Sequence, residues 1–405
     1  MLLLIENVSE ILTMKHGIGV VNDASILVED GVIKNIGQIK IGRRRIKTID
    51  AHGCVVCPGF VDSHTHLVYG GSREDEFALR VTGVKYEKIA KAGGGIASTV
   101  KKTRETTEQE LYELGMGRIT NVVKHGTTTI ECKTGYGLST AEELKMLRAI
   151  DRLKKDAPVD IIATYLVHTI PQHMKRRDYI DLVIEETIPE VAKQRSATFC
   201  DIFCDKLAFT KKESEKILLK ARACNLGLKI HADQFANTGG ARLAAKLECS
   251  SADHLEYTTK SAINAMKRAG VIPTLLPGVT FFLQMKKKPN IKAYRDTRSS
   301  VAIASDYNPG SCMIYSMPKI ISFACILYGM HIEEALIGAT KNGAKALGLS
   351  ERIGSIEIGK QADLVVLSVD NYKKIPYYFG EDIVKYTIKK GRVIYGENCW
   401  VYSQF

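Results

Sequence analysis

Short apolar segments alternate with longer amphipathic ones through the middle of this 405-residue chain, and this alternation limits the folds open to it. The short segments predict strands, and the patterns between them predict helices, most of which begin at a capping residue. Eight strands are expected, over residues 59–65, 127–133, 160–168, 199–204, 226–231, 250–255, 270–276 and 301–306. The clearest helices are expected over residues 107–124, 139–154, 178–193, 211–224 and 261–269. Eight such units in about 290 residues match the size of a (β/α)8 TIM-like barrel with a parallel sheet.

Both ends of the chain predict β structure instead. Strands are expected near the start and near the end, over residues 2–5, 24–29, 31–36, 53–57, 362–367, 386–389 and 392–394. Asp30-Gly31 separates two of them, and this dipeptide is typical of a tight hairpin turn. Because chain ends often meet at the surface, we expect one small composite β-sandwich domain from residues 1–57 and 350–405, beside a barrel of residues 58–349.

Polar side chains with ligand or acid–base chemistry follow nearly every expected barrel strand. They are His64 and His66, Glu131 and Lys133, His168, His231, His254 and Asp306, although the chain contains only 10 histidines. The active site of a (β/α)8 barrel lies at the carboxyl ends of its strands. A doubly wound open sheet is the structural alternative, but it would gather polar residues at one switch point rather than over six strands.

The pair His64 and His66 indicates what such a site binds. Residues i and i+2 of a strand point the same way, so the two imidazoles project together from the end of the first barrel strand. Neighbouring imidazoles supply half of a tetrahedral or five-coordinate site for a divalent metal ion, and neutral imidazole suits zinc and iron. The alternative is a pair of unrelated polar residues at the end of a strand.

Composition excludes several other classes of protein. The chain is 45% hydrophobic and 25% charged, which predicts a globular protein with a large core. No apolar run approaches the length of a membrane span, so we expect no membrane contact and a cytoplasmic location. The net charge of +12 would suit nucleic acid, but the basic clusters lack interleaved aromatic residues. We therefore expect no nucleic acid, and a basic field that attracts small anions.

Motifs at these strand ends resemble one enzyme superfamily. The chain resembles the amidohydrolase superfamily at residues 58–66, His231, His254, Ser305-Asp306 and residues 354–367. Within it the chain resembles the imidazolonepropionase family, essentially from end to end. The motifs that carry this likeness, in order and spacing, are residues 64–73 (HTHLVYGGSR), Tyr86, 92–96 (AGGGI), 133–138 (KTGYGL), 231–234 (HADQ), 252–256 (ADHLE) and 306–311 (DYNPGS).

The resemblance implies an enzyme that hydrolyses the ring amide of 4-imidazolone-5-propanoate to N-formimidoyl-L-glutamate, the third step of histidine degradation. It implies one zinc or iron ion per subunit, which activates a water molecule and is held by His64, His66, His231 and Asp306. It also implies that Asp306 transfers the proton and that His254 steadies the water or the developing oxyanion. The implied residues for the small anionic substrate are Arg73, Tyr86, Tyr136, His168, Gln234, Asn308, Gly310 and Ser311. We also expect a homodimer.

Two positions complicate this resemblance. Gln234 stands where many members of the family have Glu, and an amide can hydrogen-bond a ring but cannot accept a proton. Lys206 lies just beyond the fourth expected strand, whereas relatives with two metal ions carry a bridging lysine within it. We therefore assign the base role to Asp306 and His254 and expect a single metal ion.

Alternatives to this function stay open at this point. The chain could be another cyclic-amide hydrolase or a deaminase, or a barrel without activity that serves as a scaffold. Arg73, Tyr86 and Tyr136 separate the first two readings, because a propionate side chain needs a cationic, fork-shaped donor and a neutral base does not. Arg73 could instead staple its own loop by pairing with Glu74 or Asp75.

Overall fold

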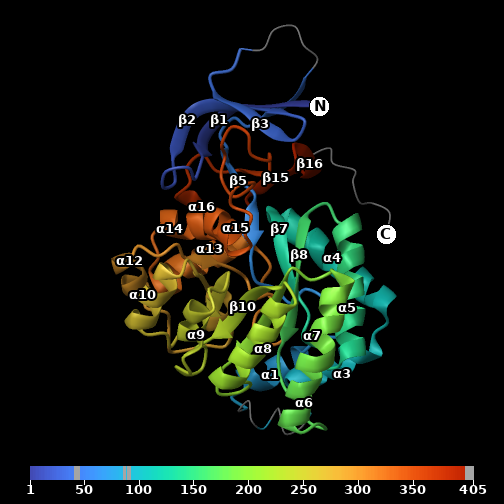
Figure 1. Cartoon of the computed structure of the whole chain (residues 1–405). Coiled ribbons are helices and arrows are strands. Elements are labelled where there is room, and N and C mark those ends of the chain that lie inside the picture. The colour runs from blue at the N-terminus through green and yellow to red at the C-terminus, as the bar shows by residue number, and fades with distance from the viewer. Residues whose placement is uncertain (41–45, 85–87, 89–92, 397–405) are drawn as a thin grey trace.

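The structure is a computed structural model that describes residues 1–40, 46–84, 88 and 93–396. Its larger part is a barrel of parallel strands, each of which pairs with the next one along the chain (Figure 1). The strands are β6 (Phe60–Asp62), β7 (Thr127–Lys133), β8 (Asp160–Val167), β9 (Phe199–Cys204), β10 (Gly227–Ala232), β11 (Ser251–His254), β12 (Ile272–Leu275) and β13 (Ala302–Ile303). The prediction of eight barrel strands is confirmed, although β6 and β13 are shorter than expected.

The barrel closes through the segments that follow its first and last strands. β6 and β13, both fully described, form no ladder with each other. Instead, the Asp306 N–H donates to the His64 carbonyl at 3.0 Å, and the His66 N–H donates to the Tyr307 carbonyl at 2.9 Å. The closing contacts thus join two segments that carry expected metal ligands.

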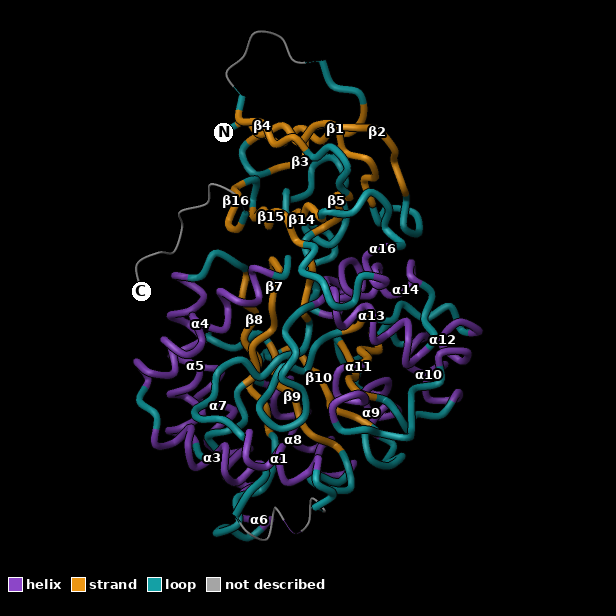
Figure 2. Tube along the Cα trace, turned by 180° about the vertical axis from the view of Figure 1, so that it is seen from behind, coloured by secondary structure: helices purple, strands orange, loops and turns teal. Residues whose placement is uncertain are grey.

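Helices surround the barrel (Figure 2). They are α1 (Glu74–Val81), α3 (Ile96–Glu105), α4 (Glu108–Lys124), α5 (Thr140–Asp156), α6 (Arg176–Leu182), η1 (Val183–Thr187), α7 (Ile188–Gln194), α8 (Lys211–Ala223), α9 (Gly240–Lys246), α10 (Lys260–Arg268), α11 (Pro277–Phe282), α12 (Ile291–Asp296), α13 (Met317–Tyr328), α14 (Ile332–Ile337), η2 (Gly338–Asn342), α15 (Gly343–Ala346) and α16 (Lys374–Tyr377). Four of the five expected helices are confirmed to within two residues. The helix expected over residues 178–193 is also confirmed, as one continuous helical run whose middle turn, η1 between α6 and α7, is π-helical. Pro189 follows this turn and has no N–H to continue a regular ladder.

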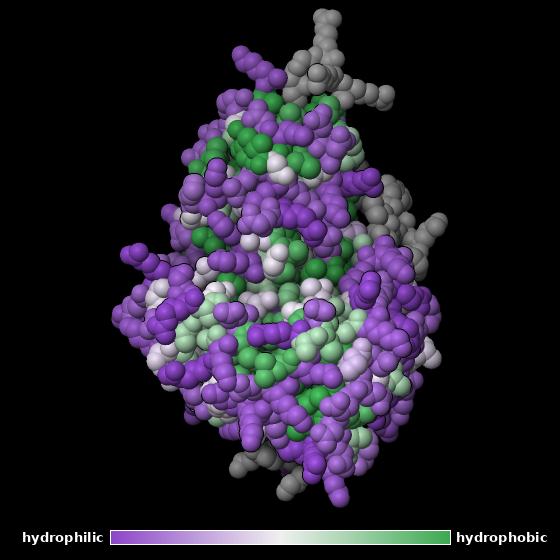
Figure 3. Space-filling model, in the orientation of Figure 1, coloured by the Kyte–Doolittle hydropathy of each residue, from purple (hydrophilic) through white to green (hydrophobic). Residues whose placement is uncertain are grey.

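The outer surface is mostly polar on the face shown in Figure 3, with apolar residues gathered near its middle and on the smaller β part. Among the described residues, no helix is both long enough and apolar enough to span a membrane. 

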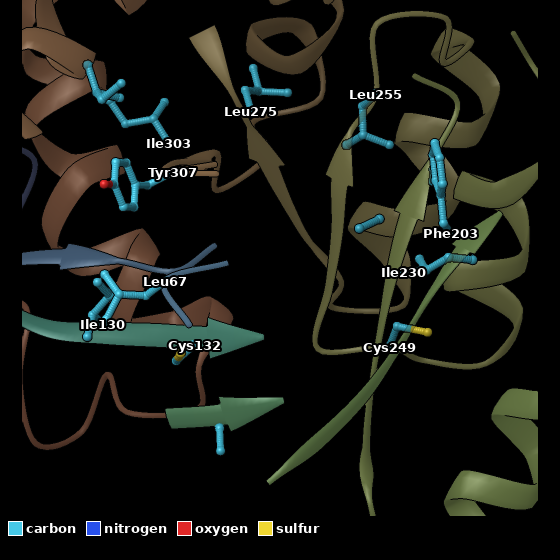
Figure 4. Packing of buried hydrophobic residues seen from close by; sticks show 14 of the residues in the cluster. Leu67, Ile130, Cys132, Phe203, Ile230, Cys249, Leu255, Leu275, Ile303 and Tyr307 are labelled. Carbon is cyan, nitrogen blue, oxygen red and sulfur yellow. The ribbon is translucent and has the colours of Figure 1, made fainter. Parts of the chain in front are cut away.

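The layer between the strands and the helices is apolar. Figure 4 shows members of its main cluster, including Ile130, Cys132 and Ile230. Side chains alternate between the two faces of a strand, so Glu131 and Lys133 lie on the opposite face of β7 from Ile130 and Cys132. The interior of the barrel therefore receives polar and charged groups from strands that are buried on both faces.

Both chain ends contribute to one small β unit at the end of the barrel where its strands begin (Figure 1). Its strands are β1 (Leu2–Leu12), β2 (Val20–Glu29), β3 (Val32–Gly37), β4 (Lys47–Asp50), β5 (Val55–Pro58), β14 (Leu364–Leu367), β15 (Val384–Lys389) and β16 (Arg392–Tyr395). β1 pairs with β4 through its first half and with β5 through its second half, and Asn7 lies at the break with a φ of 59°. β5 in turn pairs with β14. The expected composite β structure is confirmed.

Details of this unit differ from the sequence expectation. The hairpin at Asp30-Gly31 joins β2 to β3 as predicted, with φ values of 49° and 79°. β1, in contrast, has 11 residues rather than the four expected, because the bulge at Asn7 lets one strand continue between two partners. The domain boundaries after residues 57 and 349 stay a prediction.

Lys389 ties the composite sheet to the barrel. Its Nζ lies 2.7 Å from Asp363 Oδ2, 2.9 Å from Asp160 Oδ2 and 3.4 Å from Thr129 Oγ1. Lys389 and Asp363 are buried, and Asp160 and Thr129 belong to β8 and β7. One ammonium group thus joins the two parts of the molecule.

Lys389→Met should lower the free energy of unfolding by about 3 kcal/mol, because it leaves the buried Asp363 carboxylate without its cationic partner. Lys390→Met is the matched control: it removes the same charge from a side chain that is 57% exposed and lies 3.4 Å from Asp160. It should cost less than about 1 kcal/mol. Urea denaturation followed by circular dichroism measures both. Equal losses in the two variants would contradict the special role of Lys389.

Candidate active site

Five side chains with expected metal or catalytic roles meet at the carboxyl ends of the barrel strands. His64 and His66 follow β6, His231 lies in β10, His254 ends β11 and Asp306 follows β13. The ring centroid of His64 lies 4.5 Å from that of His231 and 5.7 Å from that of His254. The Nε2 atoms of His64 and His66 lie 3.3 and 3.2 Å from Asp306 Oδ1.

Several atoms of this cluster are buried without a hydrogen-bond partner among the described residues. They include His64 Nε2, His231 Nε2 and Asp306 Oδ1. Candidate ligand atoms of His64, His66 and Asp306 lie within 4.8 Å of one another, and so do those of His64, His231 and His254. A buried polar atom without a partner costs about 1–3 kcal/mol. A divalent metal ion would satisfy these atoms, so the residues present fit a metal site.

The charges around the cluster also favour a cation. Burial raises the pKa of Asp306, but the adjacent imidazoles of His64 and His66 bring it well below its usual value. Burial and Lys133 lower the pKa of His64, yet Asp253 and Asp306 more than offset them and hold it at about 9. A positive charge, whether a proton or a metal ion, is therefore stabilised between these carboxylates.

Two further carboxylates face the other nitrogen of the imidazoles. His64 Nδ1 lies 2.6 Å from Asp253 Oδ2, and His231 Nδ1 lies 3.0 Å from Asp201 Oδ2. The second oxygen of Asp253 accepts the Ser251 hydroxyl at 2.7 Å. A carboxylate that accepts the Nδ1 proton fixes the tautomer in which Nε2 carries the lone pair. Asp253 thus leaves the lone pair of His64 on Nε2, and the negative charge of Asp201 beside His231 Nδ1 favours the same tautomer there.

Two buried lysines hold these carboxylates in turn. Lys133 Nζ lies 2.7 Å from Asp201 and 2.9 Å from Glu131, and Lys229 Nζ lies 3.0 Å from Glu131. Both ammonium groups lie 3.8 Å from Asp253. All five side chains are fully buried, and burial alone would lower the pKa of Lys133, but its carboxylate neighbours raise it above its usual value. Three carboxylates and two ammonium groups leave one net negative charge beneath the cluster.

Sequence reasoning missed Asp201, Asp253 and Lys229, and it gave Glu131 and Lys133 no partners. The signal that would have found Asp253 and Lys229 is a charged residue two positions from another polar residue inside a strand, whereas Asp201 is a single charge in an otherwise apolar strand. Glu131 with Lys133 shows this spacing, as do Lys229 with His231 and Ser251 with Asp253. In a strand that is buried on both faces, such residues face the interior of the barrel and must pair there.

A cavity of about 1880 Å³ opens over the cluster. Seven of the eight expected substrate-binding residues line it, namely Arg73, Tyr136, His168, Gln234, Asn308, Gly310 and Ser311. Tyr86 lies outside the described residues. Lys206, which we considered for a second metal ion, also lines the cavity as an exposed side chain.

Tyr136 and His168 stand beside the metal site. Their ring centroids lie 5.9 and 5.8 Å from that of His66. Glu143, a buried residue of α5 that sequence reasoning missed, holds the loop carrying Tyr136, because its carboxylate accepts three N–H groups, those of Gly135, Gly137 and Leu138. This loop is therefore fixed before any ligand binds.

The loop after β13 is a compact turn built on Asn308. Its Oδ1 accepts the N–H of Gly310 at 2.8 Å and that of Ser311 at 2.9 Å, and its Nδ2 donates to the Asp306 carbonyl at 2.7 Å. The Ser311 hydroxyl donates to Asp306 Oδ2 at 3.2 Å. The Gly310 N–H, which we expected to face the substrate, is thus engaged within the turn, and the turn orients Asp306.

Arg73 lies against this turn. A Cβ added at Gly310 would stand 2.2 Å from Arg73 Nη1. Arg73 Nε and Nη2 donate to Glu76 Oε2 at 2.9 and 2.8 Å. The carboxylate partner of Arg73 is therefore Glu76. The alternative drawn from the sequence, a pair with Glu74 or Asp75, named the wrong residues.

Comparisons with known proteins agree with this geometry. The family model described as "Amidohydrolase family" matches residues 55–394. An imidazolonepropionase from Clostridium tetani is 43% identical, and the alignment covers 97% of this chain and 98% of that protein. The chain belongs to the imidazolonepropionase family of amidohydrolases. The resemblance at the motifs is thereby confirmed.

Solved structures of other enzymes share this fold. A triazine hydrolase variant has a TM-score of 0.78 at 17% identity, and the match covers 100% of this chain and 96% of that one. An adenosine deaminase from Xanthomonas campestris with bound zinc has a TM-score of 0.70 at 18% identity, over 97% and 93% of the two chains. At such identities the likeness shows the fold, and for an amidohydrolase the buried histidine and aspartate cluster is where a metal ion is expected.

Asp253→Asn should weaken zinc binding by about 10–100-fold, because the amide no longer supplies the negative charge that fixes the His64 tautomer. Ser251→Ala is the matched control, since it removes one hydrogen bond from the same carboxylate and should cost less than about tenfold. Equilibrium dialysis of the metal-depleted protein against zinc measures the dissociation constants. An unchanged constant in Asp253→Asn, with an unchanged circular dichroism spectrum, would contradict this role.

Proposed function

We propose that this chain hydrolyses the ring amide of 4-imidazolone-5-propanoate to N-formimidoyl-L-glutamate, the third step of histidine degradation to glutamate. One observation carries the proposal: end-to-end membership of the imidazolonepropionase family coincides with a buried cluster that fits a metal ion beside an arginine at the cavity wall.

His64, His66, His231 and Asp306 would hold one zinc or iron ion per subunit. Such an ion would polarise the ring carbonyl and would lower the pKa of a water molecule towards neutrality. Asp253 and Asp201 keep the imidazole tautomers that present Nε2, as their distances to His64 and His231 Nδ1 support. The donor set of three imidazoles and one carboxylate suits either metal.

Proton transfer falls to Asp306 and His254. The Asp306 carboxylate takes a proton from the attacking water and returns it to the leaving ring nitrogen. The lowered pKa of Asp306 keeps the carboxylate ionised, and the Ser311 hydroxyl holds its Oδ2. Burial lowers the pKa of His254 to about 4, so its neutral ring steadies the water or the oxyanion by hydrogen bonding. Gln234 orients the substrate ring by hydrogen bonding and takes no part in proton transfer.

The mouth of the cavity suits a small anion. Its lining residues include more cations than anions: Arg73, Arg80, Lys101, Arg104, Lys206, Lys286 and Lys287 against Glu105 and Asp306. A cleft lined by one sign of charge concentrates ligands of the opposite sign. A propionate side chain matches this field, whereas a neutral base does not.

The test is turnover of the substrate itself. 4-Imidazolone-5-propanoate, generated with urocanase, should lose its ultraviolet absorbance in proportion to the metal content of the protein, and chelation should abolish the reaction. Adenosine and hydantoin should not react. No acceleration by the metal-loaded protein, or turnover of adenosine instead, would overturn the proposal.

A homodimer and a cytoplasmic location remain our predictions for this enzyme. 

Arg73→Met should lower kcat/KM for 4-imidazolone-5-propanoate by about 2–5 kcal/mol, since the substrate carboxylate would lose its charged partner. The uncharged propionamide analogue should already be poor and lose little more. Lys101→Met is the matched control, because it removes one positive charge from an exposed side chain at the same mouth. Steady-state kinetics with both substrates measure this. If kcat/KM falls equally for the carboxylate substrate and the amide analogue, Arg73 does not bind the carboxylate of the substrate.

A further inference from the structure

The first turn of α1 carries three consecutive acidic residues, Glu74, Asp75 and Glu76. Glu74 and Asp75 are exposed, whereas the side chain of Glu76 is only 15% exposed and points towards the active-site loops. Neither the family resemblance nor the proposed mechanism gives Glu76 a role. Its contacts nevertheless lie at the wall of the substrate cavity, because Arg73 lines that cavity.

Both oxygens of Glu76 are engaged. Oε2 accepts Arg73 Nε at 2.9 Å and Nη2 at 2.8 Å. Oε1 accepts the N–H of Gly95 at 3.0 Å. Gly95 precedes α3 and has a φ of 75°, which a residue with a side chain rarely adopts. Glu76 therefore joins the loop after β6 to the start of α3.

These contacts fix the orientation of the Arg73 guanidinium. A guanidinium has two edges that can each form a pair of parallel hydrogen bonds, a side edge at Nε and Nη2 and an end edge at Nη1 and Nη2. Glu76 binds the side edge. Nη1 stands beside Gly310, where any side chain would collide with it. The guanidinium is thus held between Glu76 and the turn after β13, and within the described part of the chain its end edge binds no second carboxylate.

We infer that Glu76 is a specificity-determining positioning residue, which holds the side edge of Arg73 so that the end edge meets the carboxylate of the substrate. The inference rests on the proposed function. An ordered arginine binds a carboxylate more tightly, because a free arginine side chain loses much conformational entropy when it is fixed. The negative charge of Glu76 weakens the attraction of Arg73 for the substrate carboxylate. The other cations at the mouth of the cavity maintain the attraction for an anion.

Glu76→Gln tests this role, with Asp75→Asn as the matched control from the same helical turn. Glu76→Gln should raise KM for 4-imidazolone-5-propanoate about tenfold, or about 1.4 kcal/mol, and leave kcat within about twofold. KM for the propionamide analogue should stay unchanged. Asp75→Asn, which removes the same charge from an exposed side chain, should change none of these values. Bound metal should be equal in all three proteins.

Gly310→Ala gives a second, independent measurement. The added methyl group would displace Nη1, so KM should rise for the carboxylate substrate and not for the amide. A lower KM in Glu76→Gln would mean that Glu76 competes with the substrate for Arg73, and an equal fall of kcat on both substrates would mean a structural role. Either result overturns the inference.

The failure of this inference can be told from that of the proposed function. Calorimetric binding of 3-(imidazol-4-yl)propanoate, a carboxylate with no ring amide to hydrolyse, reports on Arg73 without turnover. If the wild type does not turn over 4-imidazolone-5-propanoate, the proposed function fails, whereas the inference stands only if Glu76→Gln weakens binding of this probe about tenfold. If the wild type is active and Glu76→Gln is unaffected in both assays, the inference alone fails.

Discussion

The geometry of the site depends on the seam between the first and last barrel strands. The strands themselves are too short to pair there, so the segments behind them do so, through the Asp306 N–H and the His64 carbonyl. The buried Asp62 carboxylate strengthens the seam, because it accepts both the N–H of Ser305 at 3.0 Å and its hydroxyl at 2.5 Å. Burial raises the pKa of Asp62 to about 6, although the hydrogen bonds from Ser305 act to lower it. The contact that closes the barrel is thus also the contact that brings Asp306 to the histidines.

A second constraint is the group of buried charges in the barrel interior. Lys133 and Lys229 with their three carboxylates cost desolvation energy that apolar residues of similar volume would avoid. In return, each carboxylate has a fixed position, and Asp253 and Asp201 can orient His64 and His231. The buried charges thus lower the stability of the fold but fix the positions of the metal-binding side chains. Such an arrangement is common where a site needs its ligands held before the metal ion binds.

The sequence predicted what lies at the ends of strands better than what lies inside them. His231 and Asp306 end apolar runs, so both the strand and the ligand were visible in the pattern. Asp253 was part of a recognised motif, but its partner His64 lies 189 residues away, and no local pattern encodes that distance. Glu76 looked like an ordinary acidic residue in a first helical turn, since only the fold brings Arg73 and Gly95 to its two oxygens. The length of β1 was underestimated for the same reason, because its second half is stabilised by β5 rather than by its own sequence.

The pairing of β5 with β14 has a consequence for how the chain is made. Residues 55–58 leave the ribosome long before residues 364–367, their neighbours in the sheet. During that interval β5 exposes an unpaired edge, and such an edge can pair with another chain. A strand that is synthesised late therefore protects a strand that is synthesised early, and folding of the small sheet must wait for it. Synthesis that stops before residue 364 would leave a barrel with an open, aggregation-prone strand at its base.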